Sequence, residues 1–234
     1  ETTLVNVLEF HQKFDSEYYR RYLDILCEKV KNFSWKLKGK YRVLNVLLPR
    51  IGATEVLQKE SHFGTNLFQC LSSNHLVSVG IAVYKTILKE ICVDLWEAQF
   101  LQPLVECLQN EENELIQNNA NIYLIPNSIK LLPKCANRLD KALETSKVTK
   151  QTWLAKLNIL KTQRTLGHIN ELDNEKMEYI REGSCHTEPD VRISAMSVLC
   201  LVSKKGNPPT EEEMKLISNF IEQNLAVDNT SFRQ

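Results

Sequence analysis

The sequence has 234 residues with 29 basic and 29 acidic side chains, and therefore no formal net charge. Its 43% hydrophobic and 25% charged content is typical of a soluble globular protein with one or two cores. No apolar run reaches the roughly 18 residues that a membrane span needs. Seven glycines and seven prolines are too few for a turn-rich β sandwich or a glycine-rich nucleotide-binding fold.

Apolar residues recur at helical spacing along the chain, and no segment alternates apolar and polar residues over a full strand length. Breaks are expected at Gly52, Gly64, Asn74, Pro103, Pro126, Pro133, Gly167 and Gly183. In chain order, the pattern predicts helices at 16–31, 40–50, 53–60, 64–72, 75–90, 95–109, 112–124, 134–145, 150–165, 171–182 and 190–203, and one more from Thr210.

The last two of these helices differ in kind. The helix at 190–203 is apolar on nearly every side, which predicts a helix packed between neighbours. The residues that we expect to be buried in it are Val191, Ala195, Val198, Leu199 and Val202. In the next helix, Thr210 and Glu213 have the spacing of a capping box. Its expected core-facing stripe is Met214, Ile217, Ile221 and Leu225.

A repeat of nearly constant length runs through the chain. Large residues that open apolar helices occur at Tyr41, Val77, Ile116, Leu154, Val191 and Phe232, at separations of 36, 39, 38, 37 and 41 residues. Periods near 40 indicate helical pairs of the HEAT and armadillo kind. The prediction is an all-α fold, an α-solenoid of about six helical pairs. We expect residues 1–234 to form a single segment of it, and a fragment of a longer protein, because no initiator Met opens the sequence and "SFRQ" ends inside a new helix.

No catalytic, cofactor-binding or metal-binding motif stands out. The sequence lacks G-x-G-x-x-G and G-x-x-x-x-G-K-[ST] phosphate loops, and "KGKY" has a single glycine. Seven scattered cysteines without C-x-x-C spacing predict buried, reduced thiols of a cytosolic or nuclear protein. His168, Cys185 and His186 do not make a four-ligand pattern. We therefore expect a non-enzyme without a metal or cofactor, located in the cytoplasm.

Basic residues gather in two stretches. Between Lys29 and Arg50 stand seven basic residues and no acidic one, with Phe33, Trp35 and Tyr41 interleaved. Between Lys130 and Arg164, nine basic residues face two acidic ones. This composition is typical of nucleic-acid contacts, and an ordinary solvated helix face is the alternative. The candidate RNA-binding residues are Lys36, Lys38, Lys40, Arg42, Arg50, Lys147 and Lys150.

Two stretches resemble the THADA family, the thyroid adenoma-associated proteins. "SWKLKGKYRVLNVLLPRIG" (34–52) is similar to a family segment in which a tryptophan precedes a Lys-Gly-Lys-Tyr helix start. Residues 191–234 are similar to a later family segment. The residues that carry this second similarity are Val191, Arg192, Leu199, Cys200, Glu213, Met214, Asn224, Leu225, Arg233 and Gln234. The loop "SKKGNPP" and the stretch "AVDNTS" depart from the family pattern, which is typical of a distant member, such as one from an invertebrate.

The resemblance implies a function that the composition does not. Members of this family are long α-solenoids that act as non-catalytic partners of a Spb1/FtsJ-like ribose 2′-O-methyltransferase, which modifies the tRNA anticodon loop. The implied role is a scaffold that positions tRNA, with tRNA and the methyltransferase as partners and no small-molecule substrate. The alternative from the residues alone is an α-solenoid adaptor that binds only proteins, for example for a membrane-associated client.

Overall fold

The computed structural model of the chain describes residues 1–14, 16–200 and 208–224. These residues are folded almost entirely as helices, and none of them lies in a strand. The all-α prediction is confirmed. The chain divides into two compact units, Glu1–Cys135 (unit 1) and Ala136–Gln234 (unit 2), and each is described by itself. A single segment over 1–234 stays a prediction.

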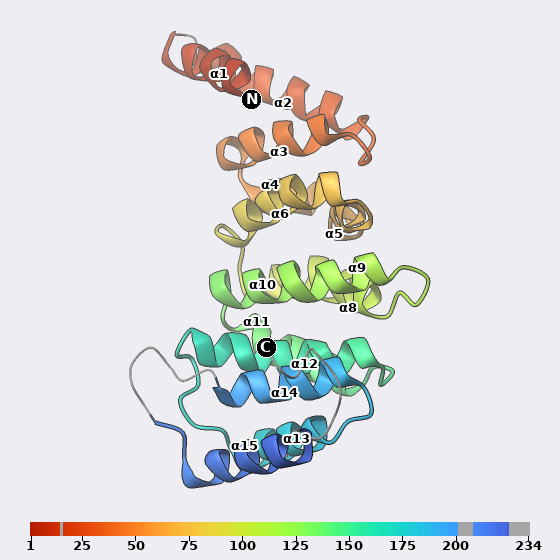
Figure 1. Cartoon of the computed structure of the whole chain (residues 1–234). Coiled ribbons are helices and arrows are strands. Elements are labelled where there is room, and N and C mark those ends of the chain that lie inside the picture. The colour runs from red at the N-terminus through yellow and green to blue at the C-terminus, as the bar shows by residue number, and fades with distance from the viewer. Residues whose placement is uncertain (15, 201–207, 225–234) are drawn as a thin grey trace. The chain divides into compact units, whose positions relative to one another are not determined.

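Unit 1 is a stack of helices joined by short turns (Figure 1). Two of its elements, η2 and η3, are π-helical, and η1 is a 3₁₀ helix. In chain order, the elements are α1 (Thr2–Phe14), α2 (Ser16–Lys31), α3 (Lys38–Ile51), α4 (Ala53–Lys59), α5 (Phe63–Phe68), η1 (Gln69–Ser72), α6 (Asn74–Leu88), α7 (Val93–Trp96), η2 (Glu97–Leu101), α8 (Gln102–Leu108), α9 (Glu114–Asn119), η3 (Ala120–Leu124) and α10 (Ile125–Leu131).

Three long elements of unit 1 stack on one another in the same direction. Helix α3 packs on α6, and α6 packs on α10. In Figure 1 the carboxyl ends of α3, α6 and the continuous α9–η3–α10 helix lie on the left side. The core between them holds a polar network in which Trp96 Nε1 donates to Tyr84 Oη (2.8 Å) and Tyr84 Oη lies 2.7 Å from Ser128 Oγ. All three side chains are buried, and the network links α6 to α7 and α10.

Pro103 and Pro126 lie inside continuous helices, where the sequence predicts breaks. The sequence predicts a break at Pro126, but the helix continues from α9 through η3 into α10. A proline ring clashes with the carbonyl one turn earlier in an α-helix and lacks an N–H donor. The wider π turn just before Pro126 accommodates the ring. The π segment η2 stands in the same place before Pro103.

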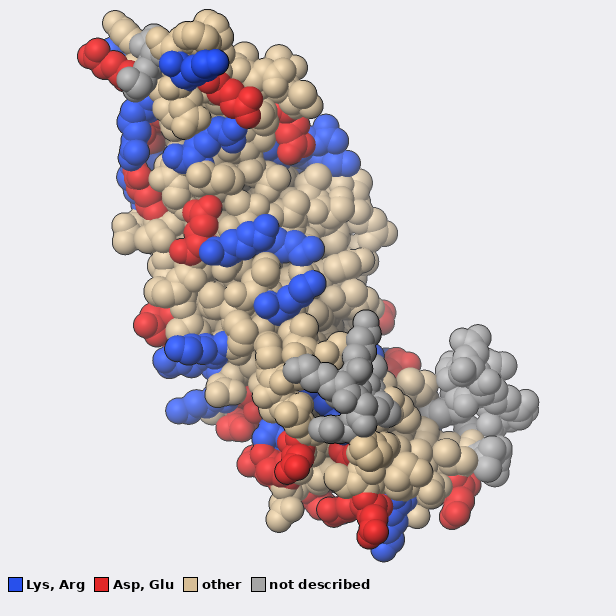
Figure 2. All heavy atoms as spheres, turned by 90° about the vertical axis from the view of Figure 1, so that its left-hand side faces the viewer, with Lys and Arg blue, Asp and Glu red and all other residues tan. Residues whose placement is uncertain are grey.

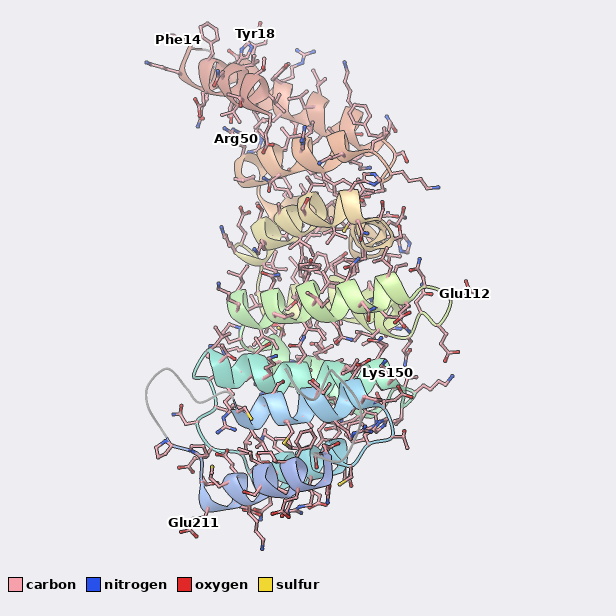
Figure 3. The ribbon with its side chains drawn as sticks, viewed as in Figure 1. Phe14, Tyr18, Arg50, Glu112, Lys150 and Glu211 are labelled. Carbon is pink, nitrogen blue, oxygen red and sulfur yellow. The ribbon has the colours of Figure 1, made fainter. Side chains whose placement is uncertain are left out.

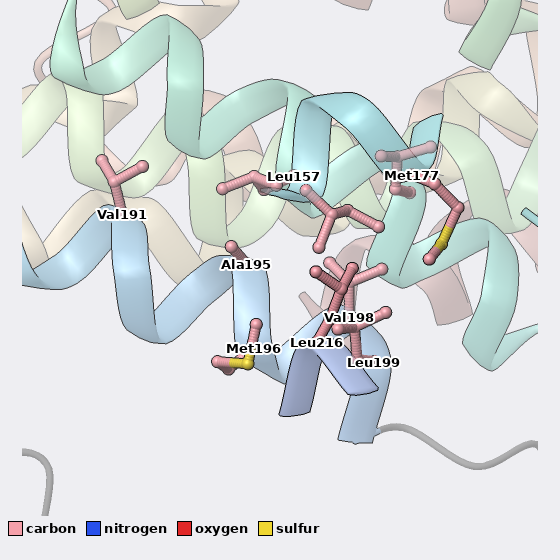
Figure 4. Close-up of a cluster of buried hydrophobic side chains, with 10 residues drawn as sticks. Leu157, Met177, Val191, Ala195, Met196, Val198, Leu199 and Leu216 are labelled. Carbon is pink, nitrogen blue, oxygen red and sulfur yellow. The ribbon is translucent and has the colours of Figure 1, made fainter. Parts of the chain in front are cut away.

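Unit 2 contains the helical elements α11 (Cys135–Glu144), α12 (Lys150–Thr165), α13 (Asn174–Ser184), α14 (Pro189–Cys200) and α15 (Glu211–Asn224). Helix α14 packs against α12, α13 and α15, with its apolar side chains in the shared core (Figure 4). Val191, Ala195, Val198 and Leu199 are fully buried, as predicted. Val202 and the repeat start at Phe232 lie outside the described residues.

Helix α15 has the predicted cap but a different buried face. Thr210 N donates to Glu213 Oε2 (3.0 Å) and Glu213 N donates to Thr210 Oγ1 (3.2 Å), so the capping box is confirmed. Of the predicted stripe, Leu225 lies outside the described residues. Ile217 packs against the core as predicted, but Met214 and Ile221 are about half exposed. Leu216 and Glu213 face the core instead. A buried ion pair, Arg164 Nη2–Glu213 Oε1 at 2.7 Å, holds this face against α12.

The predicted repeat agrees with the observed helices. Elements that contain the five anchors from Tyr41 to Val191 begin at residues 38, 74, 114, 150 and 189, so their starts lie 36, 40, 36 and 39 residues apart. Helix α1 was not predicted. The thiols are unpaired as expected, but their burial was overestimated: only Cys70 and Cys135 are buried, and Cys92, Cys185 and Cys200 are exposed.

Candidate nucleic-acid interface

Lys40 is not available to a phosphate, which corrects one predicted contact. It lies one turn into α3, and its side chain folds back over the end of α2, where it is 2% exposed. Its Nζ donates to the carbonyl oxygens of Phe33 (2.8 Å) and Lys31 (3.1 Å) and lies 4.1 Å from the centre of the Trp35 ring. The ammonium therefore caps the carboxyl end of α2, an end that favours a cation. Burial lowers the pKa of Lys40.

Trp35 and Tyr41 complete this packed turn. Tyr41 is fully buried, and its hydroxyl donates to the Trp35 carbonyl oxygen at 2.7 Å. The Trp35 ring meets the rings of Tyr41 and Phe63 edge-on, at centroid distances of 5.6 and 5.4 Å. Trp35 and Tyr41 therefore pack into the core of unit 1, whereas Phe33, the third aromatic residue of the first basic stretch, is 45% exposed.

Three other predicted residues do lie at the surface. Lys36 is exposed in the turn, and Lys38 and Arg42 are exposed on the first two turns of α3. The helix begins at Lys38, two residues earlier than predicted, and Leu37 at its N-cap supplies no side-chain hydrogen bond. Cations at a helix amino end oppose the helix dipole. Lys36, Lys38 and Arg42 therefore remain candidate phosphate contacts.

Arg50 lies at the other end of the same helix. Twelve residues separate it from Lys38, which corresponds to about 18 Å along an α-helix. Figure 3 shows Arg50 at the carboxyl end of α3. Its Nη1 donates to the Val46 carbonyl oxygen at 2.7 Å, and the side chain is half-buried. The structure thus does not bring Arg50 together with Lys36, Lys38 and Arg42.

The two predicted residues of unit 2 lie around the start of α12. Lys147 is exposed in the preceding turn. Lys150 is the first residue of α12 (Figure 3), and its Nζ lies 2.5 Å from Asp190 Oδ2 and 3.8 Å from Glu188 Oε2. These two carboxylates neutralise the Lys150 ammonium, which weakens it as a phosphate contact.

Sequence reasoning missed an acidic groove in unit 2. The groove has a volume of about 510 Å³ and lies between α11, α12 and α13. Burial raises the pKa of Asp140 on its wall, while Lys156 opposes that rise. Five carboxylates against two lysines repel a phosphate backbone. The charged residues of this groove are Asp140, Glu144, Glu175, Glu178, Glu182, Lys156 and Lys176.

The structure also bears on metal and membrane binding. Within residues 1–14, 16–200 and 208–224, no group of three or more His, Cys, Asp or Glu side chains is placed to hold a metal ion. His186 Nδ1 accepts from Glu188 N (3.0 Å), and Cys185 is exposed. The helices of the described part are too short or too polar to cross a bilayer.

Stacked helical pairs with apolar inner helices define a helical-repeat protein of the α-solenoid class. Comparison with known proteins places it more closely. The profile of a family described as "Trm732, TPR repeats" matches residues 93–234, which is more than half of the chain. The chain therefore belongs to this family, and the predicted resemblance to THADA proteins is confirmed.

Curated relatives have the same name in several animals. The chain is 25% identical over 238 residues to a Gallus gallus protein, 24% over 262 residues to one from Canis lupus familiaris, and 23% over 243 residues to one from Homo sapiens. Each is called "tRNA (32-2'-O)-methyltransferase regulator THADA". The matches cover 89 to 98% of this chain but 12 to 13% of the relatives.

Proposed function

We propose that this chain is a non-catalytic segment of a regulator of a tRNA ribose 2′-O-methyltransferase, and that it helps to position tRNA for the partner enzyme. The partner is a Spb1/FtsJ-like protein in the cytoplasm, and the modified nucleotide lies in the anticodon loop. The observation that carries this proposal is the family match over residues 93–234, together with relatives named as regulators of 2′-O-methylation at tRNA position 32.

The site supports a binding role through its charge. Lys36, Lys38 and Arg42 are exposed cations at the amino end of α3, and no ion pair within the described residues neutralises them. Exposed basic side chains next to a helix amino end attract phosphates through charge and through free backbone N–H groups. A scaffold of this kind lowers the barrier of the partner's reaction by holding the substrate in place.

The test is a reconstituted methylation assay with three components. Full-length protein, the purified methyltransferase and unmodified tRNA are mixed with S-adenosylmethionine, and each protein is also tested alone. We expect methyl transfer to position 32 from the pair, much less from the enzyme alone, and none from the full-length protein alone. Methylation by the full-length protein without the enzyme, or no stimulation of the enzyme, would overturn the proposal.

A second candidate function is protein binding alone, and exposed aromatic residues on α1 favour it. Phe10 and Phe14 are 58% and 65% exposed, and their ring centroids lie 4.9 Å apart. Paired exposed rings of this kind are typical of protein contacts. Under this alternative, the full-length protein captures the methyltransferase but shows no salt-dependent affinity for tRNA, and Phe10→Ser with Phe14→Ser abolishes the capture.

A further inference from the structure

A row of cations follows the carboxyl ends of the three stacked helices of unit 1. Arg50 lies in the last turn of α3, Lys85 in that of α6 and Lys130 in that of α10. Because α3, α6 and α10 run in the same direction and pack in that order, these ends form one edge. Lys89 is the first residue after α6, and Lys134 is the third residue after α10. The carboxyl edge of unit 1 comprises Arg50, Lys85, Lys89, Lys130 and Lys134.

Figure 2 looks onto this side of the molecule. Across the levels of unit 1, it shows blue side chains one above another, with scattered red ones among them. Lys85, Lys89, Lys130 and Lys134 are all exposed. Packed helices lie about 8–10 Å apart, so the three levels place cations along roughly 20 Å of surface.

The four lysines of this edge have no acidic partner, in contrast to several other cations of unit 1. In the described ranges, Arg20 pairs with Glu55 (3.0 Å), Lys31 with Glu28 (2.5 Å) and Lys59 with Glu55 (2.7 Å). No carboxylate within those ranges pairs with Lys85, Lys89, Lys130 or Lys134. The sequence explains this, because no acidic residue occurs from 61 to 89 or from 115 to 139.

The acidic residues nearest in sequence to Arg50 and Lys89 are Glu55 and Glu90, and both have other partners. Glu55 is paired with Arg20 and Lys59 on α4. Glu90 Oε2 accepts a hydrogen bond from Ala53 N at 2.8 Å, at the amino end of α4. The edge therefore keeps a net positive charge.

Helix stability accounts for part of this pattern only. The helix dipole favours a cation in the last turn, which explains Arg50, Lys85 and Lys130 individually. The spacing of four residues between Lys85 and Lys89 places like charges on one face, where they repel each other. Lys134 also follows Lys130 by four residues, but it lies in the turn after α10 and adds a cation beyond the helix end. Exposed cations that local helix stability does not require indicate a role in binding an anion.

An exposed aromatic residue lies on the same continuous helix as Lys130. Tyr123 is in η3, seven residues and about two turns before Lys130. Its ring is 39% exposed, and Asn127 Nδ2 on the next turn donates to the Tyr123 carbonyl oxygen (2.6 Å). Cations spaced along an edge with an exposed ring are the combination that holds a nucleic-acid backbone and stacks an unpaired base.

We propose that the carboxyl edge of unit 1 binds the phosphate backbone of an RNA strand, with Tyr123 stacking on an unpaired base. The edge lies on the opposite ends of the stacked helices from Lys36 and Lys38. The identity of the RNA as tRNA rests on the proposed function. The charge and spacing of the edge require only a phosphodiester chain.

The test measures tRNA affinity of the full-length protein over a range of salt concentrations. The neutral variant Lys85→Gln, Lys89→Gln, Lys130→Gln should lose about tenfold or more in affinity, and its log–log salt slope should fall by about two to three. Replacing the same three lysines with Glu should reduce tRNA affinity further, because each change reverses the charge. Tyr123→Ala should weaken binding about fivefold or more without changing the slope.

A matched control changes three other exposed lysines. Lys13→Gln, Lys141→Gln, Lys215→Gln removes the same charge from exposed lysines that are not among the five edge residues, and should leave affinity nearly unchanged. Thermal unfolding of each variant separates folding from binding, and the methylation assay reports the proposed function. Unchanged affinity and salt slope in the edge variant, or an equal loss in the control variant, would overturn the proposal that the edge binds RNA. If methylation is still stimulated in that case, the proposed function stands without it. A parent protein that neither binds tRNA nor stimulates methylation would overturn the proposed function itself.

Discussion

Lys40 shows how one lysine among several can have a structural role. Its neighbours Lys36 and Lys38 point to solvent, whereas Lys40 caps two carbonyl groups and covers the Trp35 ring. In the sequence all three look alike, since each is a lysine in "KLKGK". The difference arises because Lys40 is the residue that points back at α2 once α3 begins at Lys38.

Lys40→Ala should therefore destabilise the protein. It removes the donor from two carbonyl oxygens at the end of α2, and a buried unsatisfied polar group costs about 1–3 kcal/mol. Lys38→Ala on the next exposed position is the matched control and should change the free energy of unfolding by less than about 0.5 kcal/mol. Urea unfolding followed by circular dichroism checks both. Equal stability of the two variants would contradict the capping role.

Asp140 predicts a pH dependence of stability in unit 2. Burial raises its pKa above the usual value near 3.9, so the folded state holds this proton at pH values where the unfolded chain has lost it. The stabilising contribution is present at low pH and is lost as the pH rises through the raised pKa. Asp140→Asn should therefore be more stable than the parent at pH 7, with the advantage shrinking toward pH 3.5. Denaturant melts at both pH values measure this difference.

The control for Asp140 is Glu144→Gln, an exposed carboxylate one turn later on α11. It should change stability little at either pH. The expected result is contradicted if Asp140→Asn raises the free energy of unfolding no more at pH 7 than at pH 3.5. In that case, ionising Asp140 in the folded state does not destabilise the protein.

At the scale of elements, α15 depends on one buried ion pair. Glu213 closes the capping box of α15 and also binds Arg164, whose Nη1 donates to the Val198 carbonyl oxygen at 3.2 Å. The pair thereby links α12, α14 and α15 through two side chains that are less than 10% exposed. Breaking a buried pair leaves the remaining charge without compensation.

Glu213→Ala should cost about 3–5 kcal/mol of stability, because Arg164 stays buried without its partner. The double variant Arg164→Met, Glu213→Leu removes both charges and should recover much of that loss. Chemical denaturation of the two variants and the parent gives the comparison. A single variant as stable as the parent would show that the ion pair does not hold α15 in place.

The helices themselves were predictable where periodicity was strong. Helix α12 has the predicted bounds, and the fully buried residues of α14 were named correctly. The continuous α9–η3–α10 helix was not predicted, because the π turn that accommodates Pro126 has no simple sequence signal. The buried face of α15 was predicted only in part, at Ile217. An ion pair brings Glu213 into the core, and hydrophobic patterning alone does not anticipate a buried carboxylate.

The candidate site was predictable in composition and only partly in place. Basic density singles out residues 29–50 as a candidate surface, and contacts between helices decide which of these cations stay exposed. Lys40 and Lys150 are held by protein groups, whereas Lys36, Lys38 and Arg42 are exposed. The carboxyl edge was missed because its residues are far apart in the sequence and meet only when parallel helices stack.

For the whole molecule, the amino end of α3 gives a separate prediction about tRNA. Lys36→Glu, Lys38→Glu and Arg42→Glu together should weaken tRNA binding by the full-length protein and lower its salt slope by about two to three. The melting temperature should stay nearly unchanged, because all three side chains are exposed. Adding Lys40→Glu should reduce stability without a further change in slope. An unchanged slope in the triple variant would identify this surface as a solvated face.

The central claim is that this segment touches tRNA, and cross-linking tests it most directly. Full-length protein and its methyltransferase are irradiated with bound tRNA, and cross-linked peptides are identified by mass spectrometry. The account predicts cross-links in unit 1, at the turn before α3 and near Tyr123, Lys85 and Lys130 on the carboxyl edge, and none along the acidic groove of unit 2. Cross-links confined to other parts of the protein, while methylation proceeds, would contradict it.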